Sequence, residues 1–307
     1  MSLAEGSTTP IIVDASQVTA TIRSLQGINA GPRTRERESH LFRQYEDIGV
    51  DYVRTHDYYG PADMHVLFPD PEADPDDQSS YDFVSTNREL EAIRRVGAEI
   101  LFRLGYSWGD PAAPVTYVAP EDHEAWAQAA VHVTRHYNDG WADGFHWDVE
   151  YWEVGNEPDI DTLWTGTPEE YYQLYETVAR SLRAYDPDLK VGGPGSCCDP
   201  AFFVDFLAHC RDHQVPLDFV SWHYYGRPAG LIERDNGVQR ALDTYRFTET
   251  ESLLTEWNVS VWPEYEHLQD ATGAAYTALV LSQLQDTSVT IANRYRGDGG
   301  PASTTRA

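Results

Sequence analysis

Short apolar runs alternate along this chain with amphipathic stretches that are long enough to form helices. This alternation is typical of repeated strand–helix units built around a parallel sheet. The apolar runs predict eight strands, at residues 24–29, 50–56, 99–104, 149–156, 189–193, 217–223, 252–257 and 289–295. Eight parallel strands joined by helices close into a (β/α)8 TIM barrel, which is the α/β fold that we expect.

The sequence also marks where several of the intervening helices begin and end. Thr167 is followed by a proline and then by Glu170, a pattern that predicts a helix starting with a capping box. Asp199, again followed by proline, predicts a second capped start. Gly49 and Gly97 each lie just before a predicted strand, as a glycine that ends a helix should.

The end of the chain departs from this pattern. After the eighth predicted strand only about a dozen residues remain, and their Gly, Pro, Ser and Thr content cannot supply a helix that buries one face. Either the barrel closes without a regular eighth helix, or the chain has been shortened. We therefore expect an N-terminal tail at 1–10, a barrel at 11–296 and a C-terminal tail at 297–307, with no room for an accessory domain.

The charge of the chain excludes one class of partner. The sequence has 50 acidic and 22 basic residues, a formal net charge of -28, and Lys190 is its single lysine. So acidic a surface repels nucleic acid, and we expect no nucleic-acid partner. Because salt screens the repulsion among carboxylates, the charge leads to the hypothesis of a halophilic protein. The alternative is an ordinary acidic protein.

The cysteines and the chain ends bear on cellular location. Cys197, Cys198 and Cys210 are too few and too clustered for a disulfide framework, and we expect buried thiols. The first ten residues lack the basic start and apolar stretch of a secretory signal, and no run is long enough to span a membrane. These features predict a cytoplasmic protein without membrane contact. Secretion stays open if the N-terminus was trimmed, and an oligomer is also left open.

The longest stretch without a regular pattern is 57–82, and its middle, 69–77, is dense in aspartate and proline. Because it follows the second predicted strand, it would lie on the carboxyl-terminal face of the barrel and wall one side of a cleft. Its carboxylates raise a calcium hypothesis. The spacing matches no EF-hand loop, however, and a solvated acidic loop is the favoured interpretation.

Two glutamates end predicted strands on the face where barrel proteins collect functional side chains. Asn156 and Glu157 follow an aromatic strand and precede a proline, and Glu256 ends the seventh predicted strand beside Trp257. A carboxyl group among aromatic rings is partly desolvated, so its pKa rises and it can donate a proton near neutral pH. At a separation of about 5 to 5.5 Å, one glutamate would protonate a leaving oxygen while the other attacks a sugar carbon, as in a retaining glycoside hydrolase. Either glutamate taken alone is equally well explained by a structural ion pair.

Other predicted strand ends supply partners for this pair. Arg54 could hydrogen-bond Glu256 and hold it ionised, or pair with another of the many carboxylates. His223 and Tyr225 could contact sugar hydroxyls or the nucleophile, or simply be satisfied by their neighbours. The tryptophans placed to stack on sugar rings are Trp108, Trp164, Trp257 and Trp262. We expect no metal and no cofactor, because no zinc-type ligand spacing and no phosphate-binding glycine loop occurs in the sequence.

Taken in order, these motifs resemble glycoside hydrolase family 39, the β-xylosidase and α-L-iduronidase family, whose acid/base and nucleophile follow strands four and seven. The matching motifs span roughly residues 25–260, and the two glutamate motifs are the specific ones. They are Gly-Ile-Asn at 27–29, Val-Arg-Thr-His at 53–56, Trp-Glu-Val-Gly-Asn-Glu-Pro-Asp at 152–159, Val-Gly-Gly-Pro at 191–194, Asp-Phe-Val-Ser-Trp-His-Tyr at 218–224 and Thr-Glu-Trp-Asn at 255–258.

The resemblance implies a role for each matched position. It implies that Glu157 is the general acid/base, that Glu256 is the nucleophile, and that Asn156 binds the 2-hydroxyl beside the cleaved bond. His56 and His223 are similar to sugar-contacting positions of the family. The implied partner is an oligosaccharide or glycoside substrate.

The chain departs from the family pattern where the substrate is concerned. Gly155 stands where a bulky aromatic is usual, which would widen the pocket floor, and 292–296 lack the tryptophan pattern of the eighth strand. We also expect no accessory β-sandwich of the kind usual in the family. We expect an exo-acting β-glycosidase of the β-xylosidase type, although Arg294 and Arg296 could serve a uronic acid substrate. The alternatives are an endo-acting xylanase or glucanase of the same clan and a barrel that binds carbohydrate without cleaving it.

Overall fold

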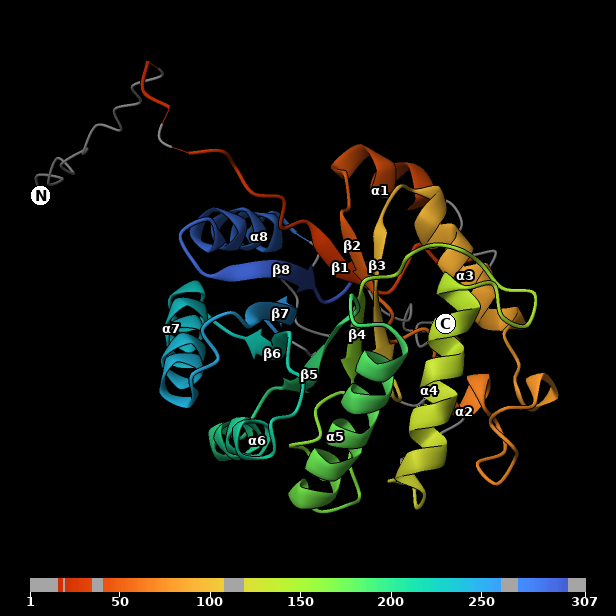
Figure 1. The fold of residues 1–307 in the computed structure, drawn as a ribbon. Coiled ribbons are helices and arrows are strands. Elements are labelled where there is room, and N and C mark those ends of the chain that lie inside the picture. The colour runs from red at the N-terminus through yellow and green to blue at the C-terminus, as the bar shows by residue number, and fades with distance from the viewer. Residues whose placement is uncertain (1–15, 19, 35–40, 108–118, 261–269, 298–307) are drawn as a thin grey trace, which may run out of the picture.

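The computed structural model, which describes residues 16–18, 20–34, 41–107, 119–260 and 270–297, confirms the predicted barrel (Figure 1). Eight parallel strands pair in sequence order, and β1 pairs with both β2 and β8, which closes the sheet. The strands are β1 (Gly27–Asn29), β2 (Tyr52–Arg54), β3 (Glu99–Leu104), β4 (Tyr151–Val154), β5 (Lys190–Ser196), β6 (Phe219–Tyr225), β7 (Glu251–Asn258) and β8 (Val289–Arg294).

Helices surround the barrel on its outer side (Figure 1). Within the described residues, at least one α-helix follows each strand from β1 to β7. The helices are α1 (Phe42–Ile48), α2 (Met64–Leu67), the 3-10 helix η2 (Gln78–Ser80), α3 (Val84–Arg95), α4 (His123–Asn138), α5 (Pro168–Tyr185), α6 (Pro200–His213), α7 (Pro228–Tyr245) and α8 (Ala271–Leu284). The predictions of a missing helix after the eighth strand and of a tail at 1–10 fall on residues outside the described ones.

The helix boundaries follow the signals in the sequence. Thr167 and Glu170 form the predicted capping box at the start of α5, each side chain satisfying a backbone N–H of the other. The side chain of Asp199 caps α6 by accepting from the N–H of Ala201. Gly49 ends α1 with φ 64°, a left-handed conformation that glycine adopts without a steric penalty.

Side chains that point into the barrel form an apolar floor with a polar layer above it. The floor lies near the amino ends of the strands and consists of Tyr52, Leu101, Tyr151, Phe219, Leu253 and Ile291. Two residues further along β2 and β3, at the next inward positions, stand Arg54 and Arg103, both completely buried. A buried guanidinium group needs charged or polar partners, so this layer determines the contacts at the carboxyl ends of the strands.

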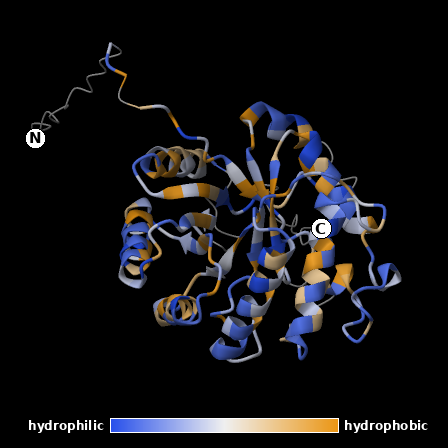
Figure 2. Ribbon diagram, viewed as in Figure 1, coloured by the Kyte–Doolittle hydropathy of each residue, from blue (hydrophilic) through white to orange (hydrophobic). Residues whose placement is uncertain are grey.

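Between the barrel and the helices lies a single large apolar core (Figure 2). It contains the outward side chains of the strands, such as Trp152 and Val154, and the inward faces of helices, such as Tyr175 of α5. Blue, hydrophilic residues cover much of α3 and α5, whereas α8, which has no charged residue, is coloured mainly orange and white (Figure 2). None of the described helices combines the length and the hydropathy needed to cross a lipid bilayer.

The prediction that Cys197 and Cys198 are buried thiols is wrong. The two residues form a disulfide with each other, and Cys197 is half-buried while Cys198 is exposed. The physical reason is their place in the loop between β5 and α6, where the chain leaves the core. Cys210, on the inward face of α6, is the buried thiol that we expected.

Residues 57–82 are more ordered than the sequence suggested, because Met64 and Leu67 are buried and fix the short helix α2. The side chains of Asp70, Asp74 and Asp77 each accept a hydrogen bond from the backbone N–H two residues further on. These are Asx turns, in which a carboxylate stabilises its own loop. Asp70, Asp74 and Asp77 therefore serve local turns, and no acidic residue of 57–82 belongs to a group of described residues that could hold a metal ion.

Candidate active site

The carboxyl ends of β4, β6 and β7 bring three chemically active side chains together. Glu157, His223 and Glu256 each offer one nitrogen or oxygen atom, and these atoms lie within 4.8 Å of one another. Glu157 is 5% exposed and Glu256 is 3% exposed. The two glutamates that the sequence predicted to meet at the barrel mouth thus converge, on a histidine from the strand beside β7.

A sharp turn after β4 presents Glu157. Gly155 has φ 85°, and Glu157 has φ 47°, a left-handed conformation that costs a residue other than glycine on the order of 1 kcal/mol. The turn is held by two backbone hydrogen bonds: Gly155 donates to the carbonyl of Leu104 at 2.7 Å, and Glu157 donates to the carbonyl of Gly195 at 3.1 Å. Unfavourable backbone conformations held in this way are common at functional sites.

The surroundings of Glu157 favour its protonated form. Burial, and after it the negative charge of Asp159, raise its pKa to about 8, while Arg54 acts in the opposite direction. Nδ1 of His223 lies 2.8 Å from Oε1 of Glu157. Burial lowers the pKa of His223 to about 4, so this histidine is neutral at neutral pH. Glu157 is therefore placed to give up a proton.

Glu256 has different partners. Arg54 donates to its Oε1 at 2.7 Å, and the hydroxyl of Tyr225 donates to its Oε2 at 2.6 Å. Burial raises the pKa of Glu256, while the Arg54 cation and the Tyr225 hydrogen bond lower it. Among the described hydrogen bonds, Glu256 has a cation as a partner and Glu157 has a neutral histidine. A cation stabilises the ionised carboxylate, so these contacts favour a proton on Glu157 over a proton on Glu256.

Arg54 connects this pair to the rest of the polar layer. Besides Glu256, it donates to Oε2 of Glu153 at 2.5 Å and to Oδ1 of Asn156 at 2.7 Å. The predicted contact between Arg54 and Glu256 is confirmed. Glu153 was missed, although its inward position, two residues after Tyr151 on β4, was a signal that it needs a buried cation.

His56 lies beside the glutamate pair on the β2 side. It is completely buried, and its Nε2 is 3.3 Å from Oδ1 of Asp57 and 3.4 Å from Oε1 of Glu256. Burial and the neighbouring Arg54 lower its pKa well below the usual value, so it is neutral. The structure thus brings together seven of the site residues that the sequence suggested, namely Arg54, His56, Asn156, Glu157, His223, Tyr225 and Glu256.

Trp257, another candidate, lies elsewhere. Successive residues of a strand face opposite sides, so with Glu256 pointing inward Trp257 points toward the helices. Its ring packs against Tyr276 of α8 and is 1% exposed, which leaves no surface for a sugar. Trp108 and Trp262 lie outside the described residues.

A second group at the barrel mouth escaped sequence reasoning. Asp57, completely buried, is contacted by the Tyr295 hydroxyl and lies 3.4 Å from Nη1 of Arg296, which also donates to the Tyr59 hydroxyl at 2.7 Å. The charge of Arg296 is thus paired with Asp57. Arg294 follows the inward-facing Asn293 on β8 and faces the helix layer. Arg296 is therefore paired and Arg294 points away from the site, so neither is placed to bind a uronic acid.

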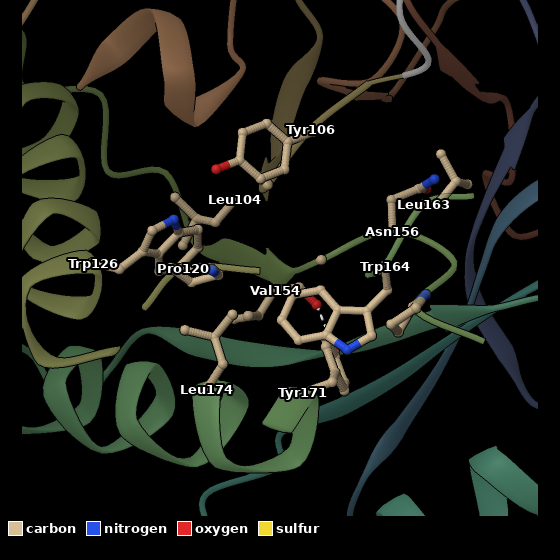
Figure 3. A pocket seen from close by; sticks show the side chains of 13 residues that line it. Leu104, Tyr106, Pro120, Trp126, Val154, Asn156, Leu163, Trp164, Tyr171 and Leu174 are labelled. Atoms are coloured by element: carbon tan, nitrogen blue, oxygen red, sulfur yellow. Dashed lines mark hydrogen bonds between the residues drawn. The ribbon is translucent and has the colours of Figure 1, made fainter. Parts of the chain in front are cut away.

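A small cavity of about 30 Å³ lies at the carboxyl ends of β3 and β4, on the side of α4 and α5 (Figure 3). Tyr106, Trp126 and Trp164 line it, together with Asn156. Gly155 is also in its wall, and a Cβ atom added there would lie 2.9 Å from the ring of Tyr171. The space that an aromatic side chain would need at position 155 is therefore taken by α5.

Two groups of described residues could hold a metal ion. One is the glutamate pair with His223, whose side chains are held by hydrogen bonds to each other, to Arg54 and to Tyr225. The other lies on the outer faces of α5 and α6, where Oε2 of Glu176 is 2.9 Å from Nε2 of His209 and 3.1 Å from Nδ1 of His213. Arg180 also pairs with Glu176, so an ion-pair network accounts for this second group.

The fold and the site together define the class: a (β/α)8 barrel with paired glutamates at the carboxyl ends of β4 and β7. The family model for glycosyl hydrolases family 39 matches residues 23–296, and the chain therefore belongs to this family. The resemblance that the motifs suggested is confirmed.

Individual relatives agree with this membership. The chain is 27% identical to a beta-xylosidase of Geobacillus stearothermophilus over 280 residues, which cover 81% of this chain and 55% of the relative. It is 28% identical to a beta-xylosidase of Caldicellulosiruptor saccharolyticus over 265 residues, which cover 78% of this chain and 52% of the relative. The chain thus spans about half the length of these curated relatives.

Solved structures of glycosidases are also similar to this chain. A glucosidase from Croceicoccus marinus superimposes with a TM-score of 0.81 at 32% identity, covering 90% of this chain and 60% of that one. A monomeric beta-xylosidase from Caulobacter crescentus has a TM-score of 0.73 at 22% identity, covering 90% of this chain and 62% of that one. The second match supports the fold alone.

Proposed function

We propose that this chain is the catalytic barrel of a retaining, exo-acting β-glycosidase, with Glu157 as general acid/base and Glu256 as nucleophile. The observation that carries the proposal is the convergence of the two carboxyl groups, whose nearest oxygens lie within 4.8 Å. Retaining enzymes hold these groups about 5 to 5.5 Å apart, whereas inverting enzymes leave about 6.5 to 9.5 Å for a water molecule. An approach within 4.8 Å is consistent with the shorter spacing of a retaining enzyme.

The contacts support a different task for each glutamate. In the first step the Glu256 carboxylate attacks the anomeric carbon while Glu157 gives its proton to the glycosidic oxygen, so that the C–O bond breaks and a glycosyl ester forms on Glu256. In the second step the Glu157 carboxylate takes a proton from water, and the water displaces Glu256 from the anomeric carbon. Arg54 and Tyr225 orient the nucleophile, and Arg54 also fixes the Asn156 amide for a sugar hydroxyl.

The substrate that we propose is a neutral β-glycoside, with xylose as the first candidate sugar. Both curated relatives quoted above are beta-xylosidases, and the structural relative at 32% identity is a glucosidase, which makes glucose the second candidate. The pairing of Arg296 with Asp57 favours a neutral sugar over a uronic acid.

Hydrolysis of nitrophenyl glycosides tests this proposal. We expect turnover of the β-xyloside or the β-glucoside, little turnover of the uronide, and a β-configured first product in proton NMR. Glu256→Gln and Glu157→Gln should each lose most of the activity, and azide should restore turnover in Glu256→Gly, which lacks the nucleophile. Glycoside binding without turnover in the wild type would favour a non-catalytic barrel, and an α-configured first product would contradict retention.

A further inference from the structure

The loop after β5 holds a carboxylate that follows Glu157 by two residues. Oδ2 of Asp159 accepts hydrogen bonds from three successive backbone N–H groups, those of Cys197, Cys198 and Asp199, at 3.1, 2.7 and 2.8 Å. Asp199 is the N-cap of α6, so these N–H groups lie at the positive end of a helix of 14 residues. Successive N–H groups in this position form an anion-binding concavity, and here the anion is a side chain of the chain itself.

A second contact joins the same two loops. The N–H of Glu157 donates to the carbonyl of Gly195, directly before the turn that binds Asp159. The left-handed backbone of Glu157 persists only where its surroundings hold it. The contact at Glu157 and the three contacts at Asp159 therefore fix the segment that presents the acid/base at two points.

The turn that binds Asp159 is closed by the disulfide between Cys197 and Cys198. A covalent bond between neighbouring side chains restricts the conformations of both residues, and these are two of the residues whose N–H groups point at Asp159. Cys198 is exposed and Cys197 is half-buried, so a reductant in solution can reach the bond.

We propose that Asp159 is a positioning residue for Glu157 and that the turn closed by Cys197 and Cys198 holds it in place. This proposal rests on the acid/base role proposed above for Glu157. Asp159 acts through the backbone and through its charge, and it is not assigned a contact with the substrate.

The charge of Asp159 also bears on the proton of Glu157. After burial, it is the largest influence that raises the pKa of Glu157. The other charged or titratable groups that face Glu157, from β2, β6, β7 and the loop after β2, are Arg54, Asp57, His223, Tyr225 and Glu256. Loss of the Asp159 charge therefore lowers the pKa of Glu157, so that Glu157 gives up its proton at a lower pH.

Reduction of the disulfide probes its part in this arrangement. A dithiol such as dithiothreitol delivers two electrons and two protons, the bond between the two Sγ atoms breaks to give two thiols, and the reductant becomes a cyclic disulfide. The turn then holds its N–H groups less firmly, so we expect a milder form of the defect caused by loss of Asp159.

The test compares two glycosides of one sugar that differ only in the leaving group. Dinitrophenolate leaves without protonation, whereas methanol needs the general acid. For Asp159→Asn and Asp159→Ala we expect kcat/KM to fall by about 10-fold or more with the methyl glycoside and by less than about threefold with the dinitrophenyl glycoside. The basic limb of the pH profile should move to lower pH. Asp161→Asn removes an exposed carboxylate from the same loop and should change none of these values.

The other outcomes distinguish the role of Asp159 from the acid/base role of Glu157 and from the role of the disulfide. Equal losses on both glycosides with an unmoved basic limb would overturn the proposal, because a purely structural role predicts that result. Asp159→Asn keeps the shape of the side chain and remains informative if the alanine variant does not fold. If Glu157→Gln lacks the same leaving-group dependence, the acid/base assignment itself fails. Reduced wild type, with its thiols verified by mass spectrometry, should resemble Asp159→Asn, and unchanged leaving-group dependence after reduction would remove the disulfide from the proposal.

Discussion

The guanidinium group of Arg54 donates to Oε1 of Glu256 at 2.7 Å, and both side chains are almost completely buried. The same cation also pairs with Glu153, so one arginine compensates two buried carboxylates. Breaking a buried pair leaves an uncompensated charge in a medium of low dielectric constant, which is far more costly than breaking a surface pair. Arg54 is therefore central to both the stability and the chemistry of the barrel.

We predict that Arg54→Lys lowers kcat/KM by about 100-fold or more, because an ammonium group is a point charge that cannot contact Glu153, Asn156 and Glu256 together. Arg54→Ala should in addition lower the free energy of unfolding by about 3 to 5 kcal/mol. Urea unfolding and steady-state kinetics measure the two effects. Arg43→Ala, which breaks an exposed ion pair with Asp47, is the control and should change neither value. A fully active Arg54→Lys variant would show that the nucleophile does not need the guanidinium fork.

The pH dependence of kcat/KM should reflect the raised pKa of Glu157. Because the acid must be protonated to donate, activity should fall as the pH rises through about 8, where Glu157 loses its proton. Glu157→Gln removes this titration, so its residual activity on a dinitrophenyl glycoside should lack the basic limb. A basic limb that persists unchanged in this variant would assign the titration to another group.

The same pKa shift predicts an effect on stability. Glu157 has a pKa of about 8 in the folded protein against an ordinary 4.5, so the unfolded chain releases this proton earlier as the pH rises. The carboxyl group therefore destabilises the fold increasingly between pH 4.5 and 8, and the destabilisation is fully present above that window. Glu157→Gln should be more stable than wild type by about 4 to 5 kcal/mol near pH 8.5 and by little at pH 4.5.

Urea unfolding at the two pH values measures this difference. Glu91→Gln, at an exposed position on α3, is the matched control and should show no comparable dependence on pH. A Glu157→Gln variant that gains as much stability at pH 4.5 as at pH 8.5 would mean that the gain does not come from ionisation.

The net charge of -28 predicts that salt stabilises the fold. Raising KCl from about 0.05 to 1 M screens the carboxylates and should raise Tm by about 5 °C or more. Because salts also strengthen apolar burial at molar concentration, the diagnostic part is the rise below about 0.3 M, where screening dominates. Sucrose at the same osmolality is the control and should not reproduce the early rise. A Tm that does not respond to KCl would remove the hypothesis of a halophilic protein.

Sequence reasoning recovered the architecture because barrel strands are buried on both faces and are separated by capped helices, so each strand is visible as an apolar run. Strand ends then located Glu157 and Glu256, since polar residues that end such runs must face the barrel mouth. Trp257 was misplaced although the information was present: it is adjacent to Glu256, and alternation along a strand puts adjacent residues on opposite faces.

Other features depend on geometry that local patterns do not contain. The contact between Asp57 and Arg296 joins residues at opposite ends of the barrel sequence, and only the closure of β1 on β8 brings them together. The disulfide between Cys197 and Cys198 depends on the turn after β5, and the role of Asp159 depends on where that turn directs its N–H groups. Adjacent cysteines alone are compatible with thiols or with a bond.

Covalent trapping tests the central claim most directly. A 2-deoxy-2-fluoro glycoside with a dinitrophenyl leaving group slows the second step, so the glycosyl ester accumulates on the nucleophile and can be located by mass spectrometry of a digest. The account predicts one added fluorosugar on the peptide that contains Glu256, and none in Glu256→Gln. A label on Glu153 or Glu157, or inactivation by the reagent without any covalent label, would contradict it.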